Sequence, residues 1–144
     1  MAGFRAVREV VQAVANGGTG GPRIPDDALV VRGGGEHEGK SPGGNSISGL
    51  TRGIGPHPDG PVGFSAESAE GATFCQLCAN IKQNEVGVTT AGAIRLEGGD
   101  VVPTTGRSPT HVTVTNLSPT DANKLLTPVV QNPVPKEERR TFEQ

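Results

Sequence analysis

The side chains best suited to chemistry fall in three short segments of the sequence. Arg32 ends an apolar run, and Ser65 and Ser68 belong to the run Phe-Ser-Ala-Glu-Ser. Arg107 precedes His111 by four residues. An imidazole exchanges protons near neutral pH, and a guanidinium offsets negative charge that develops on a phosphate, so this combination is typical of sites that hold or cleave phosphate-bearing ligands. We therefore predict His111 and Ser65 as catalytic residues. The predicted cofactor-binding residues are Arg32, Ser68 and Arg107.

Each of these predictions has a structural alternative. A buried guanidinium must pair with a carboxylate, reach solvent or hold an anion, so Arg32 is otherwise expected in a salt bridge with Asp26, Asp27 or a nearby glutamate. Ser65 is otherwise a solvated residue near a strand end. His111 is otherwise a capping or surface histidine. The sequence leaves these alternatives open.

The pair Cys75 and Cys78 has the C-x-x-C spacing of redox and metal-binding motifs. A tetrahedral zinc site needs four ligands, and neither a second C-x-x-C nor an H-x-x-x-H motif accompanies this pair. Cys78 also shares a predicted helical face with Phe74 and Ile81. We therefore predict packing cysteines and no metal, with redox or metal binding as the alternative.

The elements that must position these residues are short. Alternating or β-branched apolar runs predict about five strands, and Gly-rich or Pro-rich segments separate them. The predicted strands are residues 28–32, 61–66, 85–90, 101–102 and 111–115. Apolar residues at three- and four-residue spacing predict three helices, and residues 91–97 predict one or two further helical turns. The helices are expected at residues 2–16, at residues 73–81 and after the N-cap Ser118.

Strands and helices are mixed along the chain, which predicts an α+β fold with one small domain. We divide the chain into an N-terminal amphipathic helix (residues 1–17), a flexible linker (18–25), an α+β domain (26–128) and an extended tail (129–144). Residues 33–60 hold few large apolar side chains and are expected to form a long Gly-rich loop, either a lid or disordered. The tail is rich in proline and charge and is expected to stay largely unpacked.

Composition excludes several classes of protein. The 22 glycines and 12 prolines among 144 residues indicate much loop, and Leu, Ile, Val and Phe total 32, enough for one small core. No apolar run approaches the ~20 residues of a membrane span, and the first residues lack the apolar segment of a secretory signal. A net charge of −2 provides no basic field for a polyanion, and two cysteines cannot form a disulfide scaffold. A cytoplasmic protein without membrane contact is expected.

An Arg-Gly pair at a strand end, followed by an aromatic-Ser-x-x-Ser strand, is similar to the arginine and serine motifs of ADP-ribosyltransferase toxins. In this sequence the motifs are Arg32-Gly33 and the segment from Phe64 to Ser68. The resemblance implies that NAD is the cofactor. It further implies that Arg32 holds the NAD phosphates and that Ser65 belongs to the nicotinamide pocket.

The third motif of that family is an E-x-E or Q-x-E pair on a later strand. We expect neither pair after Ser68, so that Glu85 and Glu97 would be isolated substitutes for it. Residues 28–128 also resemble a group of small bacterial proteins, and this resemblance implies no activity.

Three functions follow from these observations. The leading hypothesis is a toxin-like effector domain that binds a nucleotide or NAD-type ligand in a cleft formed by Arg32, Ser65 and His111. Its reaction would be ADP-ribosyl transfer or NAD cleavage, and an antitoxin or immunity protein would be its partner. The first alternative is a small ribonuclease toxin, in which His111 carries a proton and Arg107 or Arg32 clamps an RNA phosphate. The second is a non-enzymatic interaction module whose helix 2–16 lies in the groove of a partner protein.

Overall fold

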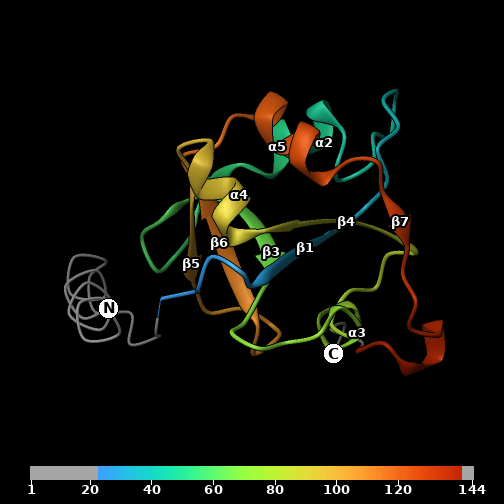
Figure 1. The fold of residues 1–144 in the computed structure, drawn as a ribbon. Helices are drawn as coiled ribbons and strands as arrows, with labels where there is room; N and C mark the ends of the chain where they lie inside the picture. Colours follow the sequence, from blue (N-terminus) through green and yellow to red (C-terminus); the bar gives the residue numbers. More distant parts are fainter. Residues whose placement is uncertain (1–22, 141–144) are drawn as a thin grey trace.

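One antiparallel sheet organises residues 23–140, the part of the chain that the computed structural model describes (Figure 1). Within this part the sheet has seven strands in the order β5, β6, β3, β1, β4, β7, and β2 pairs with β3 off this path. The strands are β1 (Leu29–Gly33), β2 (Gly55–Pro56), β3 (Val62–Glu67), β4 (Glu85–Thr90), β5 (Asp100–Pro103), β6 (His111–Thr115) and β7 (Val130–Gln131). The helices are α2 (Ile47–Gly53), α3 (Phe74–Cys78), α4 (Ala91–Leu96), α5 (Pro119–Leu126) and the 3-10 helix η1 (Lys136–Glu138). The predicted α+β class and small single domain are confirmed, with more strands than expected.

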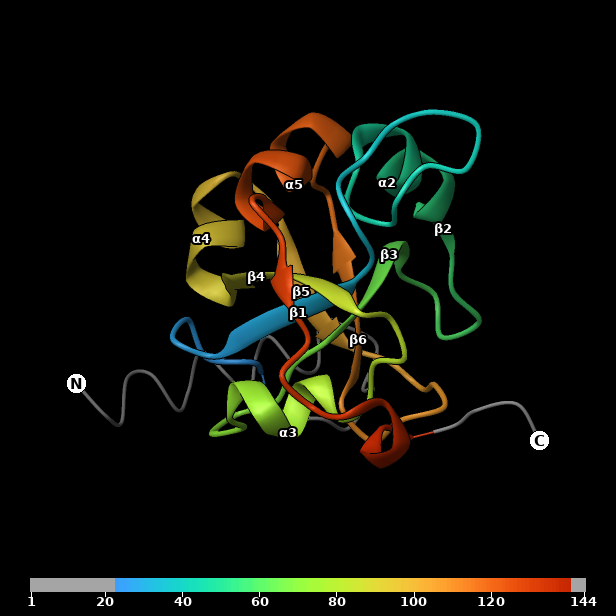
Figure 2. The same ribbon diagram turned by 90° about the vertical axis from the view of Figure 1, so that its right-hand side faces the viewer.

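Helices cover both faces of the sheet (Figure 2). α2, α4 and α5 lie on one face, and α3 lies on the other. Neighbouring side chains of β1 enter both cores, because Val30 packs with α2, α4 and α5 whereas Val31 packs with α3. A strand that is buried on both faces has a continuous apolar sequence rather than an alternating one.

The elements with strong local signals form as predicted. β6 has Val112 and Val114 in the core and its polar side chains on the opposite face. α5 begins after the predicted cap, where the Ser118 hydroxyl accepts a hydrogen bond from the backbone N–H of Asp121. α4 forms the predicted helical turns after β4.

Residues 33–60 are more regular than the long loop that the sequence predicted. They contain α2 and β2, and the Ser46 side chain caps α2. The turn before α2 is fixed by Asn45, whose Nδ2 donates to the carbonyls of Arg32 (2.9 Å) and Gly34 (2.8 Å). Polar anchors of this kind leave no apolar periodicity in the sequence, so the pattern did not reveal them.

The chain after α5 packs against the sheet, where an unpacked tail was predicted. Val130–Gln131 form β7 and pair with the start of β4. Asn132 is buried, and its Nδ2 donates to the carbonyls of Cys78, Ile81 and Gln83 at 3.1 to 3.3 Å. The prolines flank β7 rather than interrupt it, so they do not remove its ladder hydrogen bonds.

The predicted N-terminal helix and most of the predicted linker lie outside the described residues. Among residues 23–140, none of the helices has the length and apolar character needed to cross a membrane.

The sheet opens between β1 and β3. β1 pairs with β4 over five residues, whereas its described pairing with β3 consists of Val31 with Glu67. β3 instead runs along β6, with five of its residues paired there. The end of β1 and the middle of β3 therefore border an interruption of the ladder, and two of the predicted site residues, Arg32 and Ser65, lie there.

Candidate functional site

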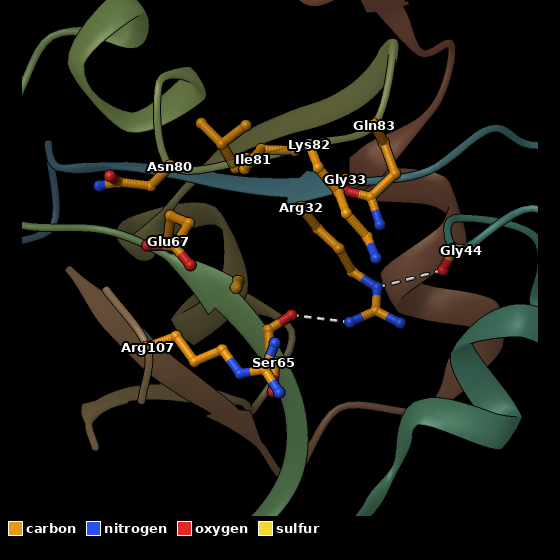
Figure 3. A pocket seen from close by; sticks show the side chains of 12 residues that line it. Arg32, Gly33, Gly44, Ser65, Glu67, Asn80, Ile81, Lys82, Gln83 and Arg107 are labelled. Carbon is orange, nitrogen blue, oxygen red and sulfur yellow. Dashed lines mark hydrogen bonds between the residues drawn. The ribbon is translucent and has the colours of Figure 1, made fainter. Parts of the chain in front are cut away.

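A cavity of about 310 Å³ lies where β1 and β3 part (Figure 3). Its walls come from the end of β1, the middle of β3, the chain that follows α3, and single residues of two loops. The lining residues include three cationic side chains, those of Arg32, Lys82 and Arg107, and one carboxylate, that of Glu67. The excess of positive charge on this wall favours an anionic ligand.

Neutral groups hold Arg32 at the edge of the cavity. Its Nε donates to the carbonyl of Gly44 (3.1 Å), and its Nη1 donates to the carbonyl of Ser65 (2.7 Å). The guanidinium carbon lies 5.0 Å from the centre of the Phe64 ring. Within the described chain, no carboxylate forms an ion pair with Arg32. Burial lowers the pKa of Arg32 to about 10, because the cation is desolvated.

The carboxylates that were considered as partners of Arg32 lie elsewhere. Asp26 accepts a hydrogen bond from Arg95 (2.6 Å), and Asp27 is exposed. Arg95 also donates to Asp100 (2.9 Å). The alternative that placed Arg32 in a salt bridge with Asp26 or Asp27 is therefore wrong, because Arg95 reaches Asp26 instead.

Ser65 connects the other two residues of the predicted cleft. Its carbonyl accepts a hydrogen bond from Arg32, and its hydroxyl lies 3.1 Å from Nε2 of His111. The register of β3 and β6 explains the second contact, since Ser65 pairs with Thr113 while Glu67 pairs with His111. Diagonal neighbours on one face of a sheet are within reach of long side chains. Arg32 and Ser65 line the cavity, and His111 is joined to it through Ser65.

The hydroxyl-rich loop before β6 is organised around Glu67. The Glu67 carboxylate accepts hydrogen bonds from Ser108 and from Thr110, the latter at 2.5 Å. Asn80 donates to the Thr110 hydroxyl (2.9 Å). This loop presents Arg107 at the cavity, where the sequence predicted a ligand-binding residue.

Ser68 lies away from the cavity lining. Its side chain is buried, and its hydroxyl donates to the carbonyl of Leu29 at 2.6 Å. This hydrogen bond ties the chain after β3 to the start of β1. The geometry thus gives Ser68 a structural role and offers no support for ligand binding.

The cysteines are free thiols in different surroundings. Both belong to α3, where Cys75 is exposed and Cys78 is buried in the core. Burial raises the pKa of Cys78 to about 11, which suits a packing residue rather than a reactive thiolate. Over residues 23–140, no group of three or more metal-ligating side chains is found.

No protein-family model, no curated protein and no solved structure matches this chain. The likeness to ADP-ribosyltransferase toxins therefore depends on short motifs, and the chemistry of the site depends on its own geometry.

Four polar residues of the cavity wall were not predicted as site residues, namely Glu67, Asn80, Lys82 and Gln83. Lys82 and Gln83 follow α3 and line the cavity opposite β3. The expectation that no Q-x-E pair follows Ser68 is wrong, because Gln83-Asn84-Glu85 has the Q-x-E spacing of the third transferase motif. Glu85 opens β4, which pairs with β1, so this segment lies beside the arginine motif.

A second histidine accompanies the site. The ring of His57 lies 5.6 Å from that of His111, centre to centre. Nδ1 of His57 accepts a hydrogen bond from the backbone N–H of Asp59 (2.9 Å), so its Nε2 donates to the carbonyl of Thr105 (2.7 Å). The backbone N–H of Thr105 donates to the Asp59 carboxylate and lowers the pKa of that carboxyl. This pair could not be predicted from the sequence, since His57 and His111 lie far apart in the chain.

Proposed function

We propose that residues 26–128 form a toxin-like effector domain that binds a nucleotide or NAD-type ligand by its phosphates at the cavity between β1 and β3. The proposed reaction is ADP-ribosyl transfer or cleavage of NAD, and an antitoxin or immunity protein is the proposed partner. Arg32 carries the proposal. It is a desolvated cation at a cavity, and among the described residues it has no carboxylate to balance its charge.

The donors that remain on Arg32 suit a phosphate. A guanidinium has five N–H groups, and Arg32 uses one at Nε and one at Nη1 for main-chain carbonyls, which leaves three. Arginine binds phosphate oxygens with two parallel hydrogen bonds, and Lys82 and Arg107 add positive charge to the same wall. Ser65 and Gln83 supply neutral polar groups for the rest of a nucleotide. The volume lies within the range of small-molecule sites.

One observation favours a ribonuclease toxin as a second candidate. The rings of His57 and His111 are adjacent, and imidazoles serve as general acids and bases, so one ring can accept a proton while the other donates one. This candidate predicts RNA cleavage that is lost in both His57→Gln and His111→Gln. The interaction-module hypothesis concerns residues 2–16, outside the described part, and is tested by deleting them before a pull-down.

The deciding experiment measures binding of ADP and of NAD by isothermal titration calorimetry. Arg32→Gln should weaken both ligands at least about 30-fold, because removing one partner of a hydrogen-bonded charge pair costs about 2 kcal/mol or more. Arg52→Gln is the matched control, since Arg52 is an exposed residue of α2 outside the cavity lining and the charge change is the same. Equal weakening in both variants would contradict the proposed site. Release of nicotinamide from NAD tests the reaction itself.

A further inference from the structure

Ser65 and His111 have the arrangement of a nucleophile and its base. The Ser65 Oγ lies 3.1 Å from Nε2 of His111, which is hydrogen-bond distance. The other ring nitrogen, Nδ1, lies 2.9 Å from Oγ1 and 3.3 Å from the carbonyl oxygen of Thr104. A carbonyl oxygen can only accept a hydrogen bond, so the neutral ring carries its proton on Nδ1. Nε2 is then the acceptor for the Ser65 proton.

The surrounding sheet fixes this contact. Ser65 and His111 occupy neighbouring antiparallel strands, so their distance is set by the β3–β6 register. Thr104 follows β5, and its backbone N–H donates to the carbonyl of His111 (3.2 Å). Its hydroxyl also lies 2.9 Å from that of Thr113, which is on the same face of β6 as His111. A base that is oriented by a third group in a rigid element is the arrangement that nucleophilic catalysis needs.

The Ser65 side chain is open to the cavity. It is exposed in the middle of β3 and belongs to the cavity lining together with Lys82 and Arg107. Figure 3 shows Arg107 extending toward Ser65. An electrophile bound here would meet positive charge on several sides. Phosphorus in a nucleotide ester suits this environment, because negative charge on its oxygens is offset by arginine and lysine in the transition state.

We propose that Ser65 is a covalent nucleophile toward phosphorus in a nucleotide phosphodiester or pyrophosphate, with His111 as its base. The inference rests on the proposed function, since the same cations must hold the nucleotide. First the Oγ–P bond forms and the bond from phosphorus to the leaving oxygen breaks. The Ser65 proton passes to Nε2 of His111 and from there to the leaving oxygen. A water molecule then attacks phosphorus and gives a proton to His111, and the Oγ–P bond breaks as Oγ regains that proton. The net reaction is hydrolysis with water as the co-reactant.

The test uses the full chain and the p-nitrophenyl ester of thymidine 5′-monophosphate, whose cleavage releases coloured nitrophenolate. Quenched samples are digested and analysed by mass spectrometry for a thymidylyl group on Ser65. Ser65→Ala and His111→Gln should each slow nitrophenolate release at least about 100-fold, the usual contribution of a positioned base. His37→Gln, an exposed histidine outside the cavity lining, should keep the wild-type rate. Circular dichroism verifies that each variant is folded.

Each outcome supports or overturns the inference. A rate that survives Ser65→Ala, or an adduct on another side chain, overturns it. If the wild-type chain binds ADP and releases nicotinamide from NAD but gives neither nitrophenolate nor an adduct, the nucleophile is refuted while the proposed function stands. An adduct on Ser65 in a chain that binds neither ADP nor NAD supports the nucleophile and refutes the proposed ligand. If binding, release and adduct are all absent, both are refuted.

Discussion

Replacing Arg32 by methionine should separate ligand binding from stability. Methionine keeps an unbranched side chain against Phe64, but it removes the charge and both hydrogen bonds to main-chain carbonyls. Arg95→Met is the matched control. Arg95 is also largely buried, but it bonds to the carboxylates of Asp26 and Asp100 and does not line the cavity.

Two opposing effects set the stability of the Arg32→Met variant. Loss of two hydrogen bonds from a charged donor costs about 3 to 6 kcal/mol, at about 1.5 to 3 kcal/mol each. Removing the desolvated charge offsets about 3 kcal/mol of this, because burial lowers the pKa of Arg32 well below its usual range, to about 10. The free energy of unfolding should therefore fall by only about 1 to 2 kcal/mol. Arg95→Met removes the hydrogen bonds from Arg95 to the carboxylates of Asp26 and Asp100 and should cost about 2 to 3 kcal/mol.

Urea unfolding followed by circular dichroism measures the stability, and calorimetry with ADP measures the binding. Arg32→Met should fold and bind ADP at least about 30-fold more weakly, because it lacks the hydrogen-bonded charge. Arg95→Met should be less stable and bind ADP normally. If Arg32→Met lost more than about 4 kcal/mol of stability, Arg32 would be a structural cation and the charge argument would be refuted. Unchanged ADP binding would refute the ligand site.

Three further predictions concern the fold. Cys75 should react with a thiol reagent at once, whereas Cys78 should react only on unfolding. The raised pKa of Cys78 should also make the free energy of unfolding fall between pH 9 and about 11, because in that range the unfolded thiol has lost its proton and the buried one has not. Gly63→Ala should lower the free energy of unfolding by about 2 kcal/mol, measured by thermal unfolding, because the added Cβ would lie 1.8 Å from a main-chain oxygen of β6. The control Gly55→Ala should leave the stability unchanged, because a Cβ there has no atom within 4 Å. Asn132→Ala should cost about 3 kcal/mol by the same measurement, since three carbonyls lose their donor.

Elements with complete local signals could be predicted from the sequence. The alternation of residues 111–115 specifies both a strand and its buried face, and Ser118 specifies where α5 begins. β1 was found because a strand buried on both faces leaves an unbroken apolar run. These signals act within a few residues and need no knowledge of the rest of the fold.

α2 and β7 were missed because their stability comes from distant contacts. α2 is seven residues long, begins at a cap and has Leu50 as its buried residue, so it lacks a repeated apolar face. β7 has two residues, and both are exposed. It forms because β4 offers a free edge and because Asn132 binds three carbonyls beyond it. Neither the edge nor the carbonyls can be read from the sequence of the tail.

The candidate site depends on pairing that no local pattern encodes. Ser65 and Ser68 are the same residue type in one short segment, yet their contacts differ. The Ser65 hydroxyl lies within hydrogen-bond distance of His111, whereas the Ser68 hydroxyl donates to the carbonyl of Leu29. A shift of one residue in the register of β3 would turn Ser65 to the opposite face of the sheet. The early end of the β1–β3 ladder is likewise not encoded by a local pattern. It leaves the Ser65 carbonyl free to accept a hydrogen bond from Arg32 beside the cavity. The guanidinium thus lies where the sheet lacks a strand partner, and its uncompensated charge is a consequence of the topology rather than of its neighbours in the sequence.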